Sequence, residues 1–486
     1  MDPTNVLVLM SDEHNARMMG SSGHSIIQTP NLDALAARGT RFSTAYCNSP
    51  ICVPSRASFA TGRYVHQIGA WDNAAPYTGI TCQSWGHRLG DSGVPVTTIG
   101  KLHYRNSSDD VGFSDQRMPM HVMDGKGDLF GCLRNDMHPT RYQLEHVDEA
   151  SAGDSEYLRY DTAIANEAVR WLYEEAGSRS TPWCLFVSLT LPHFPLIAPA
   201  RHVDLYRLED IDMPIAWTPE QWPQHEAVNN FRRLRVQTES EVRSETAIRV
   251  ARRAYYGMCS FLDEQIGRVL DALEAAGFSS STRIVYTSDH GETLGDYGLW
   301  GKSVMYDSAS AVPMIMAGPD IPKARVSDCP VSLVDLFPSI TAASGVEPCV
   351  EDDDLPGSEL WSIAAGHEPD QRRVFSEYHA MGSSSASYML RDRQFKFGDH
   401  VGYIPQLFDL SADPSELINL AENPAYIGHV RSFETALRSI CDPRTTDIAA
   451  KADQERRIAE NGGADFIRQV GPLINFTRAP MEFQIG

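Results

Sequence analysis

The stretch Val6-Leu7-Val8-Leu9-Met10-Ser11-Asp12-Glu13 begins with five apolar residues and ends in two carboxylates. Short apolar runs bounded by polar residues are typical of strands that are buried on both faces in a parallel sheet. Similar runs occur at residues 183–191, 283–288 and 312–317. Ligands of doubly wound sheets bind beyond the carboxyl ends of the strands. We therefore expect the polar residues that follow these runs to share one site.

Amphipathic helices are predicted between these strands. Apolar residues recur at three- and four-residue steps from Tyr255 to Leu273, and Gly277 provides a stop for that helix. The stretch 161–176 has the same character. Alternating strands and helices predict an α/β core, with a large mixed, mostly parallel sheet sandwiched by helices.

A second, smaller unit is predicted after an acidic, proline-containing loop at residues 347–357. A helical stretch is predicted over residues 429–463, and the tail from Gly471 has no clear pattern. We divide the chain into a catalytic domain, residues 1–355, and a C-terminal subdomain, residues 356–486. Four short runs in this subdomain predict a small antiparallel sheet: 374–378, 387–390, 394–397 and 406–410.

The composition is that of an acidic globular enzyme. The 486 residues carry a formal net charge of −22, which argues against nucleic acid or an anionic membrane as a partner. Nine cysteines, odd in number and without paired spacing, favour a reducing compartment. No apolar run is long enough to cross a membrane, and the first residues lack a basic leader. We therefore expect a cytoplasmic protein.

The segment Pro50-Ile51-Cys52-Val53-Pro54-Ser55-Arg56 places a cysteine two residues before a proline and four before an arginine. A lone cysteine is commonly a small buried hydrophobe, and a metal pair with Cys47 lacks the further ligands of a zinc site. The segment resembles the C-x-P-S-R signature of type I sulfatases, which belong to the alkaline phosphatase superfamily. The resemblance implies that Cys52 is oxidised to formylglycine by a maturase and then acts, as the hydrated aldehyde, as the nucleophile.

Asp12-Glu13 and Asp289-His290 each follow a predicted strand. Carboxylates at adjacent strand ends can hold a hard divalent cation, although a single Asp there more often caps the next helix. The resemblance implies a metal site of Asp12, Glu13, Cys52, Asp289 and His290, with calcium as the expected ion and manganese or magnesium as alternatives. Glu13 and His290 depart from the commonest family residues, which leaves direct ligation by Glu13 open. The histidine is familiar from choline sulfatases and phosphonate monoester hydrolases.

Two further segments match sulfatase motifs. Gly100-Lys101-Leu102-His103 resembles the second sulfatase signature, which implies that Lys101 binds sulfate and that His103 hydrogen-bonds the formylglycine hydroxyl. Leu191-Pro192-His193-Phe194-Pro195 resembles the family's P-H-x-P element. His193 would then protonate the departing alcohol, a task that suits a side chain titrating near neutrality.

Three other residues complete the implied site. By the same resemblance, Lys302 is the second sulfate-binding lysine, Arg56 stabilises the formylglycine and Asn73 donates to a sulfate oxygen. The site would clamp the negative oxygens of a sulfate ester with a metal and lysines.

These matches predict an enzyme that hydrolyses a small organic sulfate monoester, closest to choline-sulfatase-like and arylsulfatase members. A phosphonate monoester or phosphodiester hydrolase on the same scaffold is the alternative, but Lys101, His103 and Lys302 favour sulfate. An unmodified, non-catalytic binding protein is the third hypothesis. We also expect a homo-oligomer. The ester stays open among choline, aryl, alkyl and sugar sulfates; choline would need an aromatic cage, for which the candidates are Trp71, Trp85, Tyr104, Trp300 and Tyr378.

Overall fold

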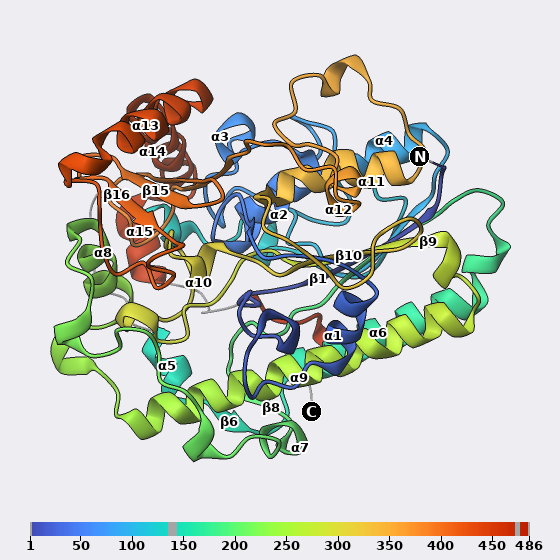
Figure 1. Cartoon of the computed structure of the whole chain (residues 1–486), viewed down its shortest axis with the longest axis horizontal. Coiled ribbons are helices and arrows are strands. Elements are labelled where there is room, and N and C mark those ends of the chain that lie inside the picture. Colours follow the sequence, from blue (N-terminus) through green and yellow to red (C-terminus); the bar gives the residue numbers. More distant parts are fainter. Residues whose placement is uncertain (1, 135–142, 472–476, 485–486) are drawn as a thin grey trace.

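The computed structural model describes residues 2–134, 143–471 and 477–484. A large sheet runs through the molecule (Figure 1). It has eight strands in the order β11-β2-β10-β9-β1-β7-β4-β5. Its strands are β1 (Asn5–Ser11), β2 (Gly39–Phe42), β4 (Val96–Lys101), β5 (Asp115–Met120), β7 (Cys184–Ser188), β9 (Thr282–Ser288), β10 (Met314–Ala317) and β11 (Arg325–Ser327).

Strand β1 lies at the centre of this sheet and pairs in parallel with both β7 and β9. The apolar run predicted at residues 312–317 forms β10, which is antiparallel to β9 and β2. The chain leaves β9 at the carboxyl edge of the sheet, and β10 starts from the same edge, so β10 runs in the opposite direction to β9. A parallel strand would need a crossover connection that returns the chain to the other edge. The predicted mixed, mostly parallel sheet is thus confirmed, with β10 as an antiparallel member.

Side chains of β1 alternate between two hydrophobic cores. Leu7 and Leu9 face the core covered by α1, α6 and α9, whereas Val6, Val8 and Met10 face the core covered by α2, α4, α11 and α12 (Figure 1). Helices on both faces make the sandwich that the alternating pattern predicts. The helices are α1 (Pro30–Ala37), α2 (Cys52–Thr61), α4 (Trp85–Asp91), α6 (Glu156–Glu174), α9 (Glu245–Ala275), α11 (Leu336–Ala343) and α12 (Trp361–Ala364).

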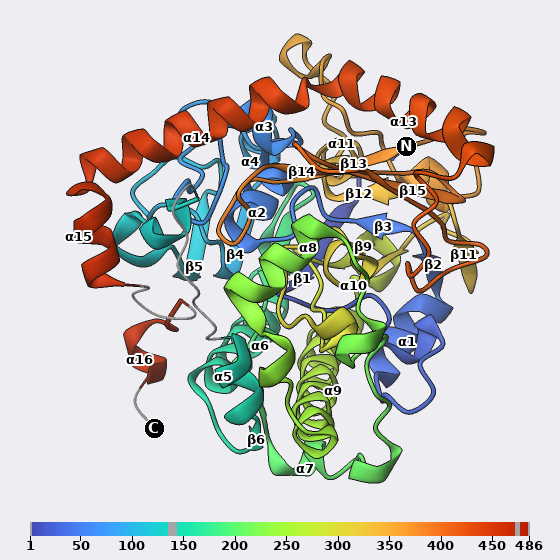
Figure 2. The same ribbon diagram turned by 90° about the vertical axis from the view of Figure 1, so that its left-hand side faces the viewer.

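The C-terminal part forms the predicted four-stranded antiparallel sheet, β13 (Val374–Tyr378), β14 (Ser387–Arg391), β15 (Phe395–His400) and β16 (Gln406–Asp409). The helical stretch predicted over 429–463 is divided into α13 (Ile427–Ile440) and α14 (Pro443–Glu460), because Asp442 caps α14 and Pro443 occupies its first turn. These helices and α15 (Gly463–Val470) arch over the molecule (Figure 2). The boundary at residues 355 and 356 stays a prediction.

The remaining elements are short. Among the described helices, none combines the length and apolarity that crossing a bilayer requires. The short elements are β3 (Ala45–Tyr46), β6 (Ser151–Ala152), β8 (Ile197–Ala198), β12 (Val331–Ser332), α3 (Val65–Ile68), α5 (Gln143–Asp148), α7 (Ala200–Val203), α8 (Glu226–Phe231), α10 (Asp307–Ser310) and α16 (Met481–Gln484).

Candidate active site

Neighbouring strand ends bring the predicted carboxylates together. Ser11, the last residue of β1, pairs with Ser288, the last residue of β9. Asp12 and Asp289 therefore emerge side by side at the carboxyl edge of the sheet. The hydroxyl of Ser55 in α2 donates to the carbonyl of Asp289 at 2.5 Å, which joins the first turn of that helix to the same edge.

Four of the five predicted metal ligands form one buried cluster. The ligand atoms of Asp12, Cys52, Asp289 and His290 all lie within 4.8 Å of one another. His290 Nδ1 donates to the carbonyl of Gly291 at 3.0 Å, so Nε2 turns its lone pair toward the cluster, 3.1 Å from Cys52 Sγ. An outward Nδ1–H bond of this kind is typical of metal-binding histidines. Cys52 is unmodified here, and its Sγ stands where formylglycine oxygens would lie.

Glu13 lies outside this four-residue cluster. Its backbone adopts a φ of 65°, and its Oε2 lies 3.0 Å from Lys302 Nζ and 3.3 Å from His193 Nε2. Burial raises the pKa of Glu13 well above its usual value, although Lys302 opposes this shift. Asp12, Glu13 and His193 form a second group of ligand-type atoms within 4.8 Å of one another.

Arg56 and Lys101 form ion pairs with the carboxylates of Asp12 and Asp289. Arg56 Nε donates to Asp289 Oδ2 at 2.7 Å, and its Nη2 reaches Asp12 Oδ2 at 3.4 Å. Lys101 forms an ion pair with Asp12. Burial opposes ionisation of Asp12, but Lys101, followed by His193, Arg56 and Lys302, holds its pKa well below the usual value. Arg56 and Lys101 thus contact the carboxylates, and neither of them lines the cavity above Cys52.

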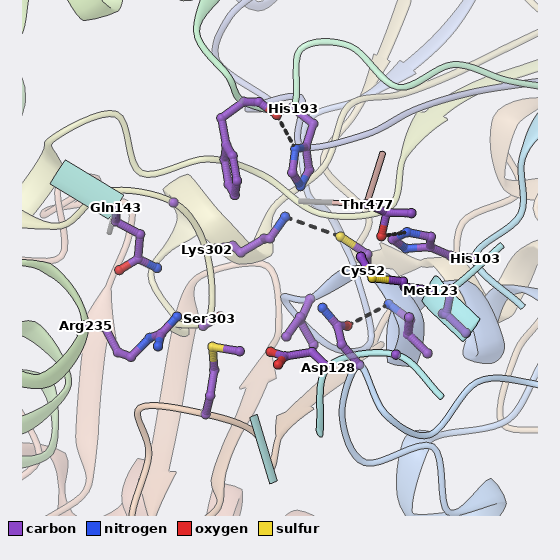
Figure 3. A pocket seen from close by; sticks show the side chains of 18 residues that line it. Cys52, His103, Met123, Asp128, Gln143, His193, Arg235, Lys302, Ser303 and Thr477 are labelled. Atoms are coloured by element: carbon purple, nitrogen blue, oxygen red, sulfur yellow. Dashed lines mark hydrogen bonds between the residues drawn. The ribbon is translucent and has the colours of Figure 1, made fainter. Parts of the chain in front are cut away.

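A cavity of about 110 Å³ opens above Cys52. Lys302 points into it, with Nζ 3.3 Å from Cys52 Sγ (Figure 3). Asn73 Oδ1 accepts a hydrogen bond from the Val53 backbone at 3.2 Å. The structure therefore brings five predicted residues to one cavity: Cys52, Asn73, His103, His193 and Lys302.

The two histidines of the cavity both have lowered pKa values. Burial, followed by the charge of Lys302, holds the pKa of His193 well below its usual value, and burial with Lys101 does the same for His103. His193 Nδ1 donates to the carbonyl of Phe194 at 2.7 Å, which leaves Nε2 facing Glu13. His103 Nε2 lies 2.8 Å from Thr477 Oγ1 (Figure 3).

Sequence reasoning missed several residues of this site. Asp161 of α6 accepts hydrogen bonds from the Thr190 backbone at 2.8 Å and the Leu191 backbone at 2.9 Å, which fixes the turn before His193. Thr477 belongs to the tail in which no pattern was found, and no local signal marks either residue. Other cavity residues that carried no motif are Met123, Asp128, Gln143, Arg235, Ser303 and Met381.

The candidate aromatic cage does not converge on the cavity. All five of its residues are buried, and none lines the space above Cys52. Phe194 is the aromatic side chain that reaches this cavity among the described residues, and Lys302 Nζ lies 5.2 Å from its ring centroid. The five belong to the packing of the protein: Trp71, Trp85, Tyr104, Trp300 and Tyr378.

Comparison with known families gives two matches. A model described as "Sulfatase" matches residues 4–346, and a model of the C-terminal part of N-sulphoglucosamine sulphohydrolase matches residues 295–442. The chain belongs to the sulfatase family. The resemblance predicted from the Cys52 motif is therefore confirmed, and the protein is a sulfuric ester hydrolase.

Named sulfatases are similar over most of this sulfatase's length. The choline-sulfatase of Rhizobium meliloti (strain 1021) is 31% identical over 473 residues, which cover 93% of this chain and 90% of the relative. Human arylsulfatase K is 27% identical over 441 residues, which cover 86% of this chain and 78% of the relative.

Solved structures share the fold at low sequence identity. The phosphonate monoester hydrolase of Agrobacterium radiobacter superposes with a TM-score of 0.72 at 22% identity, covering 90% of this chain and 95% of that one. A protein solved with its substrate D-glucosamine-2-N,6-O-disulfate gives a TM-score of 0.71 at 21% identity, covering 90% and 97%. This similarity confirms the expected alkaline-phosphatase-like fold of the sulfatase.

Proposed function

We propose that this sulfatase hydrolyses a small organic sulfate monoester to an alcohol and inorganic sulfate in the cavity above Cys52, with formylglycine formed from Cys52 as the nucleophile. The observation that carries this proposal is the position of Cys52 Sγ between the buried cation of Lys302, at 3.3 Å, and the lone pair of His290 Nε2, at 3.1 Å. A nucleophile placed between a cation and metal-ligand atoms suits attack on an anionic ester.

A divalent cation fits the cluster of Asp12, Cys52, Asp289 and His290. Two carboxylates and an imidazole whose Nδ1–H is already donated offer the oxygen and nitrogen atoms that such ions bind. When bound, the ion supplies polarisation of a sulfate oxygen, and the hydrated formylglycine supplies the attacking hydroxyl. We propose calcium, with manganese and magnesium as alternatives. Glu13 contacts Lys302 and His193, so we propose that it positions these two side chains and does not bind the metal directly.

The chain's own residues bind the sulfate group and move the proton. Lys302 contributes a fixed positive charge in the cavity. Asn73 accepts from the backbone through Oδ1, which leaves its NH₂ as a donor for a sulfate oxygen. His193 Nδ1 is engaged by the carbonyl of Phe194, so Nε2 is the atom that passes a proton to the leaving oxygen, and the ring must carry a proton at both nitrogens for that step.

Arg56 and Lys101 lie outside the cavity lining and contact the carboxylates of the proposed metal site. Their contacts place positive charge next to the carboxylates of Asp289 and Asp12. We therefore propose that they act through the metal site and that Lys302 is the lysine next to the nucleophile.

The leaving alcohol is proposed to be polar. Four polar side chains are among those that line the cavity, and the aromatic cage that choline would need is missing from the described cavity lining. These side chains are Asp128, Gln143, Arg235 and Ser303. Sulfate release measured across choline, aryl and sugar sulfates tests this proposal, and a clear preference for choline sulfate would contradict it.

The nucleophile is tested by mass spectrometry of the Cys52 peptide after co-expression with a formylglycine-generating maturase. We expect the aldehyde mass in the wild-type protein, together with sulfate release that Cys52→Ala abolishes. Cys82→Ser is the matched control, because Cys82 is only half-buried and lies outside the cavity. An intact thiol without turnover would support the non-catalytic alternative.

The phosphonate alternative is tested with paired substrates. An aryl sulfate and an aryl phosphonate monoester with the same phenol are compared by their kcat/KM. We expect the sulfate to react faster, and a much faster phosphonate reaction would overturn the proposed substrate class.

We also propose that the protein works in a reducing compartment such as the cytoplasm. All nine cysteines are unpaired, and six of them are buried, which suits a protein that does not depend on disulfides. The homo-oligomer stays a prediction, to be tested by light scattering of the purified protein.

A further inference from the structure

The segment 477–484 reaches the cavity from the far end of the chain. Thr477 lines the cavity together with Cys52 and His103, and its Oγ1 lies 2.8 Å from His103 Nε2 (Figure 3). This residue lies beyond both regions matched by the family models, residues 4–346 and 295–442. The core of the sulfatase site is therefore supplemented by a part of the chain outside those matches.

The first turn of α6 holds this segment in place. The hydroxyl of Tyr157 donates to the carbonyl of Thr477 at 2.5 Å. Glu156 accepts hydrogen bonds from Arg478 Nε at 2.8 Å and from the backbone of Ala479 at 3.3 Å. Because three consecutive residues are bound to one helical turn, the position of the Thr477 side chain is set by the fold.

The same helix also supports the other histidine of the site. The ring of Tyr157 meets the ring of His193 edge-on, with centroids 6.0 Å apart. One turn further along α6, Asp161 holds the backbone of Thr190 and Leu191 before His193. Helix α6 is thus a common support for His193 and for the residue that contacts His103.

The imidazole ring of His103 is contacted at one nitrogen by Thr477. Its backbone has a φ of 58°, and its side chain is buried. Nδ1 has no hydrogen-bond partner among the described residues, whereas Nε2 is bound to Thr477. A hydrogen bond at one ring nitrogen fixes both the ring orientation and the tautomer, and so determines what the other nitrogen offers.

We propose that Thr477 is a positioning residue of the active site: its hydroxyl orients His103, and its docked segment forms one wall of the cavity that receives the ester. This inference rests on the proposed function, because the role of His103 in the reaction is taken from it. Its hydrogen-bond component concerns the resting protein and can be measured without turnover.

The test compares Thr477→Val, which keeps the shape but removes the hydroxyl, with Thr477→Ser, which keeps the hydroxyl. We expect Thr477→Val to lower kcat about tenfold with a smaller change in KM, the loss expected for one hydrogen bond that orients a reacting group. Thr477→Ser should restore most of the wild-type kcat. Equal kcat values for Thr477→Val and the wild type, or equal losses in both variants, would overturn the proposal.

Docking of the segment is tested separately with Glu156→Gln. This change weakens the contact to Arg478 without touching the cavity, and we expect it to lower kcat in the same direction as Thr477→Val. Glu174→Gln is the matched control, since Glu174 lies exposed at the other end of α6. A Glu156→Gln variant that behaves like this control would contradict the anchoring role.

Nitrogen-15 NMR of histidine-labelled protein separates this proposal from the proposed function. The His103 signal is assigned by its loss in His103→Gln, and Thr477→Val should shift the Nε2 resonance whereas Thr477→Ser should not. If the wild-type protein released no sulfate, the proposed function would be wrong. The Nε2 resonance of His103 would still show whether Thr477 hydrogen-bonds this histidine. An unchanged His103 signal in Thr477→Val would overturn it.

Discussion

The ammonium group of Lys302 lies 3.3 Å from the sulfur of Cys52 at the floor of the cavity. Burial opposes the charge of Lys302, but Cys52, Glu13 and the carboxylates of the metal cluster raise its pKa above the usual value. The side chain therefore stays protonated in a site shielded from water. A charge held in place before the reaction stabilises negative sulfate oxygens without the cost of reorganising solvent.

Replacing Lys302 by Met should lower kcat/KM for sulfate release by about a hundredfold or more, because it removes one preorganised charge next to the reacting group. Lys323→Met is the matched control, since Lys323 is exposed and lies outside the described cavity lining. A Lys302→Met variant with the activity of this control would show that Lys302 does not bind the sulfate group.

Replacing His193 by Gln should affect substrates according to their leaving group. For an alkyl sulfate, whose alcohol must be protonated as it departs, we expect kcat/KM to fall by about 10² to 10⁴. For nitrophenyl sulfate the fall should be much smaller, because nitrophenolate departs without a proton. His367→Gln, at an exposed position, controls for the loss of an imidazole, and equal losses on both substrates would contradict the acid role.

Removal of the divalent cation should abolish turnover and lower Tm. Asp12 and Asp289 are both completely buried, and the cation offsets part of their repulsion. The purified protein is dialysed against a chelator and then titrated with calcium, manganese or magnesium while sulfate release and Tm are recorded. Asp289→Asn should bind the ion weakly and recover neither property. Full activity after exhaustive chelation would contradict the metal site.

The stability contribution of Asp161 should fall as the pH rises. Burial raises its pKa from 3.8 to about 6, although hydrogen bonds from Thr190 and Leu191 oppose this shift. The folded state thus binds this proton more tightly than the unfolded state. Between about pH 3 and pH 7 the wild type should therefore lose about 3 kcal/mol of unfolding free energy relative to Asp161→Asn. Urea unfolding across this range checks the difference, and a pH-independent difference would contradict it.

Much of the fold was predictable because its signals are local. The apolar run at residues 6–10 and the stripe from Tyr255 to Leu273 reflect the periodicities of a buried strand and an amphipathic helix. The direction of β10 was not predictable in this way, because a short apolar run has the same pattern in parallel and antiparallel pairing. The start of α9 at Glu245 was missed as well, since its first turns are polar and partly exposed.

The candidate site was predictable only as far as its contiguous motifs reach. The segments around Cys52, His193 and Asp289 contain the proposed reactive groups in short, recognisable stretches, and the structure brings them to one edge of the sheet. The five candidate cage residues did not indicate the substrate site, since large aromatic side chains are also common in hydrophobic cores, where they bury a large area.

By itself the sequence determined the reaction class and the fold class and supplied the candidates for the reactive side chains, because each depends on residues that are close neighbours in the chain. Only the tertiary structure decided what those side chains contact. It directs Glu13 to Lys302 and His193, turns Arg56 and Lys101 to the carboxylates, and brings Thr477 to His103. These contacts join residues that are dozens to hundreds of positions apart, and their distances follow from strand register and helix packing, which no local pattern encodes.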